Sequence, residues 1–174
     1  MDSRPDARNA SQAVSLRDSK PADFDRLWSL DQKCFPPGIA YDRRTLRWYM
    51  RQAQAFTIVA EMTATDIPEK SRELPGFILV NVLDGDKKDD GTTANIVTID
   101  VDEPYRRAGL GSRLLEAAEV RARSIGCAIM DLEVDVNNAV AIAFYIRHGF
   151  VIIGRIEKYY NETTDAHVMK KSLA

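Results

Sequence analysis

The sequence is poor in the features that mark several large classes of protein. Its longest unbroken apolar run, Ala139–Ile146, has eight residues, whereas a membrane-spanning helix needs about 20. Met1–Ala13 is polar throughout and lacks the apolar stretch of a secretory signal. Two cysteines, Cys34 and Cys127, are too few for a disulfide or zinc framework. We therefore expect a soluble, cytoplasmic protein whose cysteines are reduced and buried.

Neither sign of charge is in large excess. The chain has 24 basic and 26 acidic residues, a formal net charge of −2, and this balance does not favour a nucleic-acid-binding protein. His148 and His167 are the two histidines; they lie far apart in the chain, so no metal site is expected. The oligomeric state cannot be deduced from these counts.

What is present suits one domain of ordinary composition. At 174 residues and 45% hydrophobic content, the chain is long enough to bury a substantial core. We expect residues 1–13 to form a flexible tail and residues 14–174 a single domain. Strands and helices alternate, above all after residue 95, which favours an α/β (α+β) arrangement around a central sheet.

The apolar pattern locates these elements. Period-two apolar stretches predict strands at 14–17, 56–60, 76–83, 95–101, 128–134, 150–153 and 166–169. Helical spacing predicts helices at 20–34, 43–54, 109–124 and 138–147. The polar stretches 63–73 and 84–93 are expected to be long, solvated hairpin loops.

The most informative segment joins a strand to a helix and reads Arg106-Arg107-Ala108-Gly109-Leu110-Gly111-Ser112. Glycine permits close backbone approach, and the free amides at a helix start attract anions. A P-loop is excluded because Ser112 stands where it needs lysine, and the dinucleotide fingerprint lacks its third glycine, since Leu114 stands there. The pattern R-x-x-G-x-G that grips the pyrophosphate of coenzyme A remains, alongside a plain glycine turn.

Other motifs accompany this loop at defined separations. They are Asn95–Leu115, Asp131-Leu132-Glu133-Val134, Asn138 with Tyr145, His148-Gly149-Phe150, and the late segments Lys158–Asn161 and Asp165–Met169. Together they resemble the GNAT superfamily of acetyl-CoA-dependent N-acetyltransferases. The resemblance is closest to the RimI type, which acetylates ribosomal-protein alanine, and to its relatives that acetylate protein N-termini. It is specific over residues 95–172 and loose over 14–83.

The resemblance implies a fold and a cofactor. The family fold is a mixed, strongly twisted sheet of about seven strands with helices on both faces, whose fourth and fifth strands splay apart. The resemblance implies that acetyl-CoA lies in the splay, with its pantetheine arm against the backbone of Ile99, Asp100 and Val101. Its pyrophosphate would contact the loop from Arg106 to Ser112, and Asn138 would both contact the cofactor and cap a helix.

The resemblance also implies two catalytic residues. Glu133 matches a glutamate that acts as general base through water; the alternative is an ordinary polar residue on an alternating strand. Tyr145 matches a tyrosine that returns a proton to the departing thiolate, and here the alternative is a core aromatic. Acyl transfer of this kind needs no covalent enzyme intermediate, so the cysteines need no catalytic role.

The resemblance says less about the acceptor, which is the amine that receives the acetyl group. Tyr159 and Tyr160 match tyrosines that close over a peptide's first residues, and Phe35 and Tyr41 lie in the loop where the family binds its acceptor. A protein α-amine is the easier nucleophile, because its pKa is ~7.7–8 against ~10.4 for lysine. The alternatives are acetylation of a small amine and a non-catalytic acyl-CoA-binding module. Arg43, Arg47 and Arg51 share a helix face that is either solvated or binds an acidic acceptor.

Overall fold

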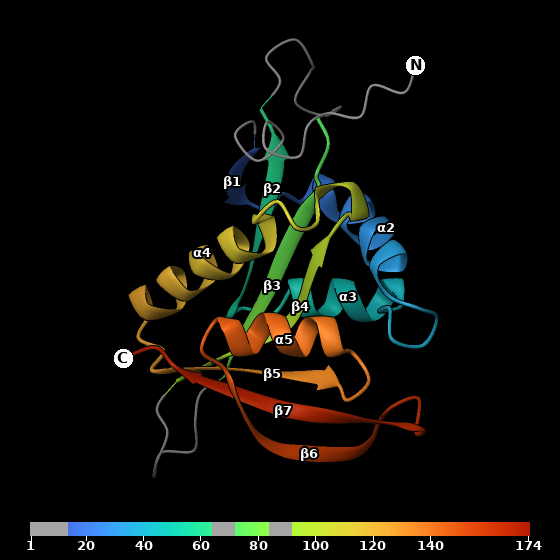
Figure 1. Cartoon of the computed structure of the whole chain (residues 1–174). Coiled ribbons are helices and arrows are strands. Elements are labelled where there is room, and N and C mark those ends of the chain that lie inside the picture. The colour runs from blue at the N-terminus through green and yellow to red at the C-terminus, as the bar shows by residue number, and fades with distance from the viewer. Residues whose placement is uncertain (1–13, 64–71, 84–91) are drawn as a thin grey trace.

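The computed structural model describes residues 14–63, 72–83 and 92–174. The expected tail at 1–13 and most of the loops predicted at 63–73 and 84–93 lie outside the described residues. Seven strands form a single sheet in the order β1-β2-β3-β4-β5-β7-β6 (Figure 1). The strands are β1 (Val14–Asp18), β2 (Ala55–Met62), β3 (Gly76–Leu83), β4 (Thr93–Val101), β5 (Ile129–Asp135), β6 (Val151–Tyr160) and β7 (Thr164–Ser172).

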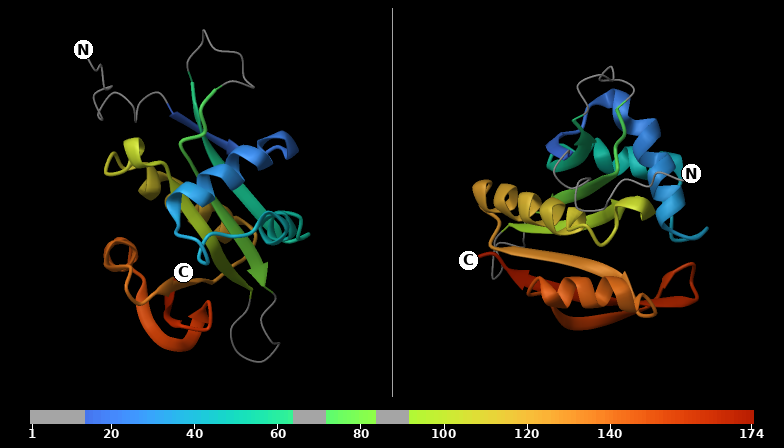
Figure 2. Two further views of the ribbon diagram at one scale, coloured as in Figure 1. Left: turned by 90° about the vertical axis from the view of Figure 1, so that its right-hand side faces the viewer. Right: turned by 45° about the horizontal axis from the view of Figure 1, so that its top comes forward.

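Four α-helices connect these strands. They are α2 (Phe24–Cys34), α3 (Arg43–Met50), α4 (Leu110–Ser124) and α5 (Ala139–Arg147), with short 3-10 turns η1 (Pro21–Asp23) and η3 (Glu103–Tyr105). In two views α4 and α5 lie on one face of the sheet and α3 on the other (Figures 1 and 2). Within the described ranges, no helix is long and apolar enough to cross a membrane.

The strands alternate their side chains between two cores. On β3, Ile78 and Val80 belong to the cluster that includes α4 and Tyr145 of α5. Phe77 and Leu79, which alternate with them, belong to the cluster that includes Leu27 of α2 and Leu46 of α3. Because both faces of the sheet are buried by helices, the prediction of a mixed sheet with helices on both faces is confirmed.

The central feature of the sheet is a split between β4 and β5. These two strands are parallel, and their paired residues run only from Thr93↔Ile129 to Ile96↔Leu132. β4 continues to Val101 while bound to β3, and β5 continues to Asp135 while bound to β7. Figure 1 shows β4 turning away from β5 beyond the paired residues. Along the split, neither facing edge is therefore paired with another strand.

A bulge in β4 accompanies the split. Leu79 of β3 pairs with Thr98, but the next residue, Val80, pairs with Ile96, so Val97 is the extra residue. An inserted residue reverses which side chains face which side of a strand. Thr98 and Asp100 are consequently buried toward α2, whereas Ile99 and Val101 pack against the core that contains α4.

Most predicted elements differ from the observed ones by a few residues at their ends, and three of these differences have a clear physical reason. The helix expected at 43–54 ends at Met50, because the chain turns back through Gln52 to enter β2 at Ala55. The last two strands are longer than expected, reaching Tyr160 and Ser172. β6 lies at the edge of the sheet, and every residue of it except Tyr160 is exposed. An exposed strand has no apolar alternation to reveal its length.

Candidate active site

The glycine-rich loop begins α4 at one end of the split. Arg107 and Gly109 both have left-handed backbones, with φ of 62° and 82°. The N–H of Arg113 bonds to the carbonyl of Gly109 at 3.1 Å, so the amides of Leu110, Gly111 and Ser112 precede the first helical hydrogen bond. Such amides, with the positive end of the helix dipole, suit an anion.

The far side of this loop is fastened to α5. His148 places Nε2 3.0 Å from Oγ of Ser112 and Nδ1 2.8 Å from the carbonyl oxygen of Phe144. A Cβ on Gly111 would lie 3.5 Å from the Phe144 ring. Side chains in and just after α5 thus hold the loop in place. This role of His148 was not predicted, because Ser112 is 36 residues away in the chain.

Arg106 lies in the predicted loop, but its side chain is directed elsewhere. Its Nε donates to the carbonyl of Val101 at 2.8 Å, and Nη2 lies 3.5 Å from Sγ of Cys34. The Cys34 thiol is also 3.5 Å from the Val101 carbonyl. Burial raises the pKa of Cys34 to about 11, so this sulfur is a neutral thiol. Arg106 therefore connects the end of β4 to α2.

Glu133 lies on β5 with its side chain directed away from the core. Its neighbours Leu132 and Val134 are buried, while Glu133 is half-buried beside the split. Nδ2 of Asn95, on β4, donates to Asp131 Oδ1 at 2.9 Å and to Glu133 Oε2 at 3.4 Å. Asn95 was not among the predicted site residues. It joins two carboxylates across the last paired positions before the strands separate.

Burial raises the pKa of Glu133, and the nearby charge of Asp131 raises it further. The hydrogen bond from Asn95 acts in the opposite direction and favours the ionised carboxylate. Burial also raises the pKa of Asp131. A carboxylate with a raised pKa, held beside an open strand edge, is a suitable proton acceptor.

Tyr145 of α5 is 6% exposed and belongs to the core that contains α4. Its ring contacts the edges of Phe144 and Phe150, with centroids 5.3 and 5.4 Å apart. Burial raises its pKa, with added contributions from Asp100 and Tyr160, so the hydroxyl is protonated at neutral pH. Across residues 14–63, 72–83 and 92–174, no group forms a hydrogen bond with this hydroxyl.

Asn138 begins the helix that carries Tyr145. Its side-chain oxygen accepts the N–H of Ala141 at 3.1 Å, which confirms the capping role predicted for it. Its predicted contact with the cofactor stays a prediction.

Tyr41 follows the loop between α2 and α3 and is firmly held. Its N–H donates to Asp31 Oδ2 at 2.8 Å, and its carbonyl accepts from Trp28 Nε1 at 3.2 Å and from Gln32 Nε2 at 2.8 Å. Its hydroxyl reaches the carbonyl of Val97, the bulge residue of β4, at 3.3 Å. Tyr41 therefore anchors the loop at residues 35–42 to the edge of the split. We call it the acceptor loop, because the sequence predicts that the acceptor binds there. Phe35 is half-buried in the same loop.

The β6–β7 hairpin approaches the split from the opposite side. Tyr159 and Tyr160 form an edge-to-face pair with centroids 4.9 Å apart, and the Tyr160 hydroxyl donates to the backbone oxygen of Glu133 at 3.3 Å. Burial raises the pKa of Tyr159 to about 12, so its hydroxyl is also neutral. Tyr159 remains 44% exposed and is available to a ligand.

The acceptor loop and the hairpin meet at Gly38. A Cβ built on Gly38 would lie 2.1 Å from Nδ2 of Asn161, the first turn residue after β6. Gly38 also has a φ of +92°, which disfavours other residues. Glycine here permits the two segments to touch, and neither Gly38 nor Asn161 was among the predicted site residues.

The residues described here fit a pantetheine thioester. The split supplies a strand edge that no other strand pairs with, and the loop supplies free amides. Glu133 offers a carboxylate with a raised pKa and Tyr145 a neutral hydroxyl; their catalytic roles stay predictions. In the part of the chain that the structure describes, no group of three or more His, Cys, Asp or Glu residues is arranged to hold a metal ion.

Comparisons with known proteins agree with this geometry. Residues 24–150 match the model of the acetyltransferase (GNAT) family. The "Probable N-acetyltransferase san" of Drosophila melanogaster is 40% identical over 81 residues, 45% of this chain and 44% of that protein. The chain thus matches less than half of that relative's length.

Two solved structures share the whole fold. Naa50 of Arabidopsis thaliana, in complex with the bisubstrate analogue CoA-Ac-MVNAL, superposes with a TM-score of 0.73 and 26% identity, covering 92% of this chain and 99% of that one. The ribosomal-protein-S18-alanine N-acetyltransferase of Escherichia coli superposes with a TM-score of 0.73 and 23% identity, covering 92% and 94%. The resemblance noted from sequence motifs is confirmed.

Proposed function

Because the chain belongs to the acetyltransferase (GNAT) family, we propose that it transfers the acetyl group of acetyl-CoA to the α-amine of a protein or peptide. The observation that carries the proposal is the split between β4 and β5, which has Glu133 at its edge and the glycine-rich loop at its end. Acetyl-CoA, when bound, supplies an activated thioester. The residues of this chain supply binding, orientation and proton transfer.

The binding residues have distinct tasks. The amides from Arg107 to Ser112 would hold the pyrophosphate, with Asn138 adding a contact from the start of α5. The backbone of Ile99, Asp100 and Val101, on the part of β4 that is not paired with β5, would hold the pantetheine amides. The Val101 carbonyl already accepts from Arg106. Arg106 contributes through its backbone, because its side chain is committed to Val101 and Cys34.

Glu133 would accept a proton from the acceptor's ammonium group, directly or through water. Its raised pKa brings it closer to that of an α-amine than an ordinary glutamate would be. Tyr145 would donate its hydroxyl proton to the departing thiolate, and its raised pKa keeps that proton in place until the thiolate forms. The two groups thus begin in opposite protonation states, as acid and base must.

The shape of the acceptor site favours a peptide. The contact between Gly38 and Asn161 joins two segments across the split, and Phe35, Tyr41, Tyr159 and Tyr160 lie on these segments. An extended chain end entering beneath them would present its α-amine toward Glu133. The peptide-bearing analogue bound to the Arabidopsis relative supports this assignment. We also propose a cytoplasmic location, supported by the two free cysteines.

Release of the coenzyme A thiol tests the proposal. The purified protein is supplied with acetyl-CoA and three matched sets of acceptors: peptides with free N-termini, the same peptides N-blocked but containing lysine, and small amines such as polyamines. We expect release with free N-termini. Release only with small amines, or only with N-blocked peptides, would contradict the proposed acceptor. Intact acetyl-CoA binding without release from any acceptor would favour a cofactor-binding module.

A further inference from the structure

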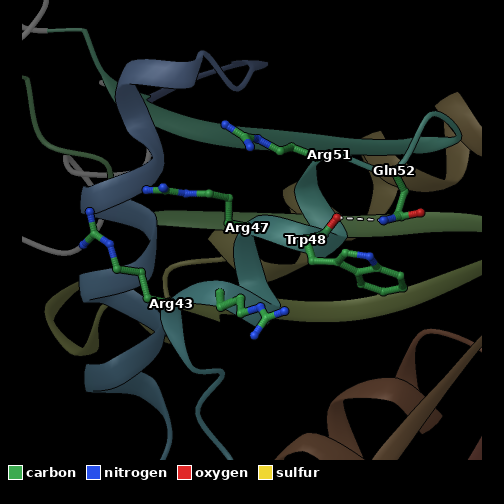
Figure 3. Close-up of a pocket in the computed structure, with 6 residues that line it drawn as sticks. Arg43, Arg47, Trp48, Arg51 and Gln52 are labelled. Atoms are coloured by element: carbon green, nitrogen blue, oxygen red, sulfur yellow. Dashed lines mark hydrogen bonds between the residues drawn. The ribbon is translucent and has the colours of Figure 1, made fainter.

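A basic surface on α3 has no part in the chemistry described above. Arg43, Arg44, Arg47, Trp48, Arg51 and Gln52 line a surface pocket of about 460 Å³, here called the α3 pocket. Figure 3 shows Arg43, Arg47 and Arg51 projecting from the side of α3 that faces α2. The whole chain carries a formal net charge of −2, so four arginines within nine residues make a strong local departure from its average.

Two of these arginines are held in place by neighbours on α2. The guanidinium of Arg47 lies 4.1 Å from the centroid of the Phe24 ring, and that of Arg43 lies 5.4 Å from Phe24 and 5.4 Å from Trp28. Asp25 accepts from Arg43 at 2.5 Å and lies 3.9 Å from Arg47. These contacts fix the two cations in advance of any ligand.

The other two arginines give the pocket an excess of positive charge. Arg44 and Arg51 are exposed, and neither forms an ion pair with any residue in the described segments. Asp25 is paired with Arg43 and Arg47, and Asp42 at the start of α3 interacts electrostatically with Arg44. Four guanidinium groups thus stand against two carboxylates. The pocket therefore attracts an anion bearing more than one charge.

An unbroken series of ring contacts links the pocket to the acceptor site. Trp48 is 56% exposed, and its ring lies 4.9 Å from that of Tyr49. Tyr49 in turn lies 5.6 Å from Tyr41, whose hydroxyl is bound to Val97 at the edge of the split. Packed aromatic side chains thus connect the helix that carries the pocket to the edge of the split.

We propose that the α3 pocket binds acidic side chains of the acceptor polypeptide, at positions beyond those held in the split. The inference rests on the proposed function and adds a specificity to it: acceptors with Asp or Glu downstream of the N-terminus are preferred. An RNA partner would suit the arginines too. The observations favour the acceptor because all four arginines lie on or just after α3, and this helix packs through Trp48 and Tyr49 toward Tyr41 at the edge of the split.

Two C-terminally labelled peptides test the proposal. They share their first three residues and differ afterwards, one carrying several Asp and Glu and the other Ser and Asn at the same positions. Fluorescence anisotropy gives affinity and initial rates give KM. We expect roughly fivefold tighter binding and a correspondingly lower KM for the acidic peptide, because exposed ion pairs are individually weak but several act together. The preference should shrink at about 1 M salt, where the Debye length is ~3 Å.

Arg51→Glu is the test variant, and Arg44→Glu combined with it is a stronger one. Arg121→Glu on α4 is the control, since it reverses one partly exposed arginine on the other face of the sheet, where Arg121 is paired with Asp18 and lies over the Phe56 ring. We expect Arg51→Glu to remove most of the preference for the acidic peptide while leaving the neutral peptide unaffected. Arg121→Glu should retain the preference.

Failure of this inference is separable from failure of the proposed function. Equal binding of both peptides, or equal effects of Arg51→Glu and Arg121→Glu, would overturn the α3 pocket as an acidic-acceptor site. A single-stranded RNA oligonucleotide that binds more tightly than the acidic peptide and displaces it would overturn it as well. Tighter binding of the acidic peptide that depends on Arg51, without acetylation of any peptide, would support the pocket and contradict the enzyme assignment.

Discussion

The residue that connects the two strands at the split is Asn95. A single amide nitrogen donates to both Asp131 and Glu133, and a donor to a carboxylate favours its ionised form. Asp131 opposes this effect, since its charge raises the pKa of Glu133. Other groups near this carboxylate are Lys170 beside Asp131 and the Tyr159 and Tyr160 hydroxyls, both neutral.

Substitution of Asn95 should move the pH profile of the reaction. In Asn95→Ala the pKa of Glu133 rises, so the acid limb of kcat/KM shifts to higher pH, with activity near pH 6 falling about threefold more than activity near pH 9. Asn95→Asp should shift the limb further in the same direction, and Asp131→Asn should shift it the other way. A uniform loss at every pH would indicate that Asn95 is a packing residue only.

Tyr145→Phe should separate chemistry from binding. We expect kcat to fall roughly 100-fold, in line with the loss of a general acid, while the affinity for acetyl-CoA measured by calorimetry stays nearly unchanged. Thermal stability should also be preserved, because the hydroxyl has no hydrogen-bond partner among the described residues to lose. Loss of acetyl-CoA binding with turnover of the bound cofactor intact would contradict the role given to Tyr145.

Local motifs predicted candidate residues at this scale, and long-range contacts account for the neighbours that they did not predict. Glu133 and Tyr145 were predicted because each lies in a short segment with recognisable neighbours, and their catalytic roles stay predictions. Asn95 was missed because its partners are 36 and 38 residues away, and a single asparagine in a strand has no distinguishing pattern. The side chain of Arg106 was assigned to the loop by sequence proximity, although its contacts lie at Val101 and Cys34.

At the scale of elements, two connecting segments lie over the proposed acceptor site. Asp31 in α2 holds the acceptor loop through the N–H of Tyr41. In the β6–β7 hairpin, Asp165 accepts the N–H of Lys158 at 2.8 Å. The two segments meet where Gly38 lies against Asn161. In the proposed function, their separation sets the room available to an acceptor.

Gly38→Ala should widen this contact and weaken acceptor binding. The added Cβ would lie 2.1 Å from Asn161 Nδ2, and the φ of +92° is itself strained for alanine. We expect the peptide KM to rise about fivefold with the acetyl-CoA KM unchanged, each measured at saturating co-substrate.

Gly126→Ala is the matched control for this substitution. Gly126 has a φ of +90°, but an added Cβ there would meet nothing within 4 Å, and it follows α4 away from the acceptor loop. It should lower the melting temperature without changing either KM. Equal effects of the two variants on peptide KM would show that backbone strain, and not the contact with Asn161, is responsible.

At the scale of the whole molecule, two cores hold the sheet and the split lies between its two halves. The arrangement was predictable in outline, because the period-two strands and the amphipathic helices identify one layered domain. The point at which β4 leaves β5 was not predictable from the sequence, because it depends on the bulge at Val97 and on pairing between strands that are distant in sequence. The burial of Asp31 and Asp100 follows from the same tertiary packing.

Those two carboxyls make stability depend on pH. Asp31 is fully buried, and burial raises its pKa from 3.8 to about 6. The folded state therefore holds this proton more tightly than the unfolded chain. Protonated Asp31 contributes fully to the free energy of unfolding below pH 3.8, and this contribution is lost as the pH rises through about 6. In Asp31→Asn the amide oxygen still accepts the N–H of Tyr41. Because the amide does not titrate, this variant does not lose stability as the pH rises through about 6.

Denaturant unfolding at several pH values measures the effect. Relative to the wild type, Asp31→Asn should gain up to about 3 kcal/mol between pH 4 and pH 7. Burial raises the pKa of Asp100 as well, and the charge of Asp31 raises it further. Asp31→Asn therefore also lowers the pKa of Asp100, which adds to the difference in the same direction. A constant difference across the range would show that Asp31 titrates normally in the folded state.

The central claim is that the acetyl group goes to an α-amine, and its position on a product peptide tests this most directly. A peptide with a free N-terminus and an internal lysine is incubated with acetyl-CoA and the protein, and tandem mass spectrometry locates the added acetyl group. We predict modification of the N-terminus alone, with its rate lowered roughly 100-fold in Tyr145→Phe. Acetylation of the lysine alone, or N-terminal acetylation at the same rate in Tyr145→Phe, would contradict the account.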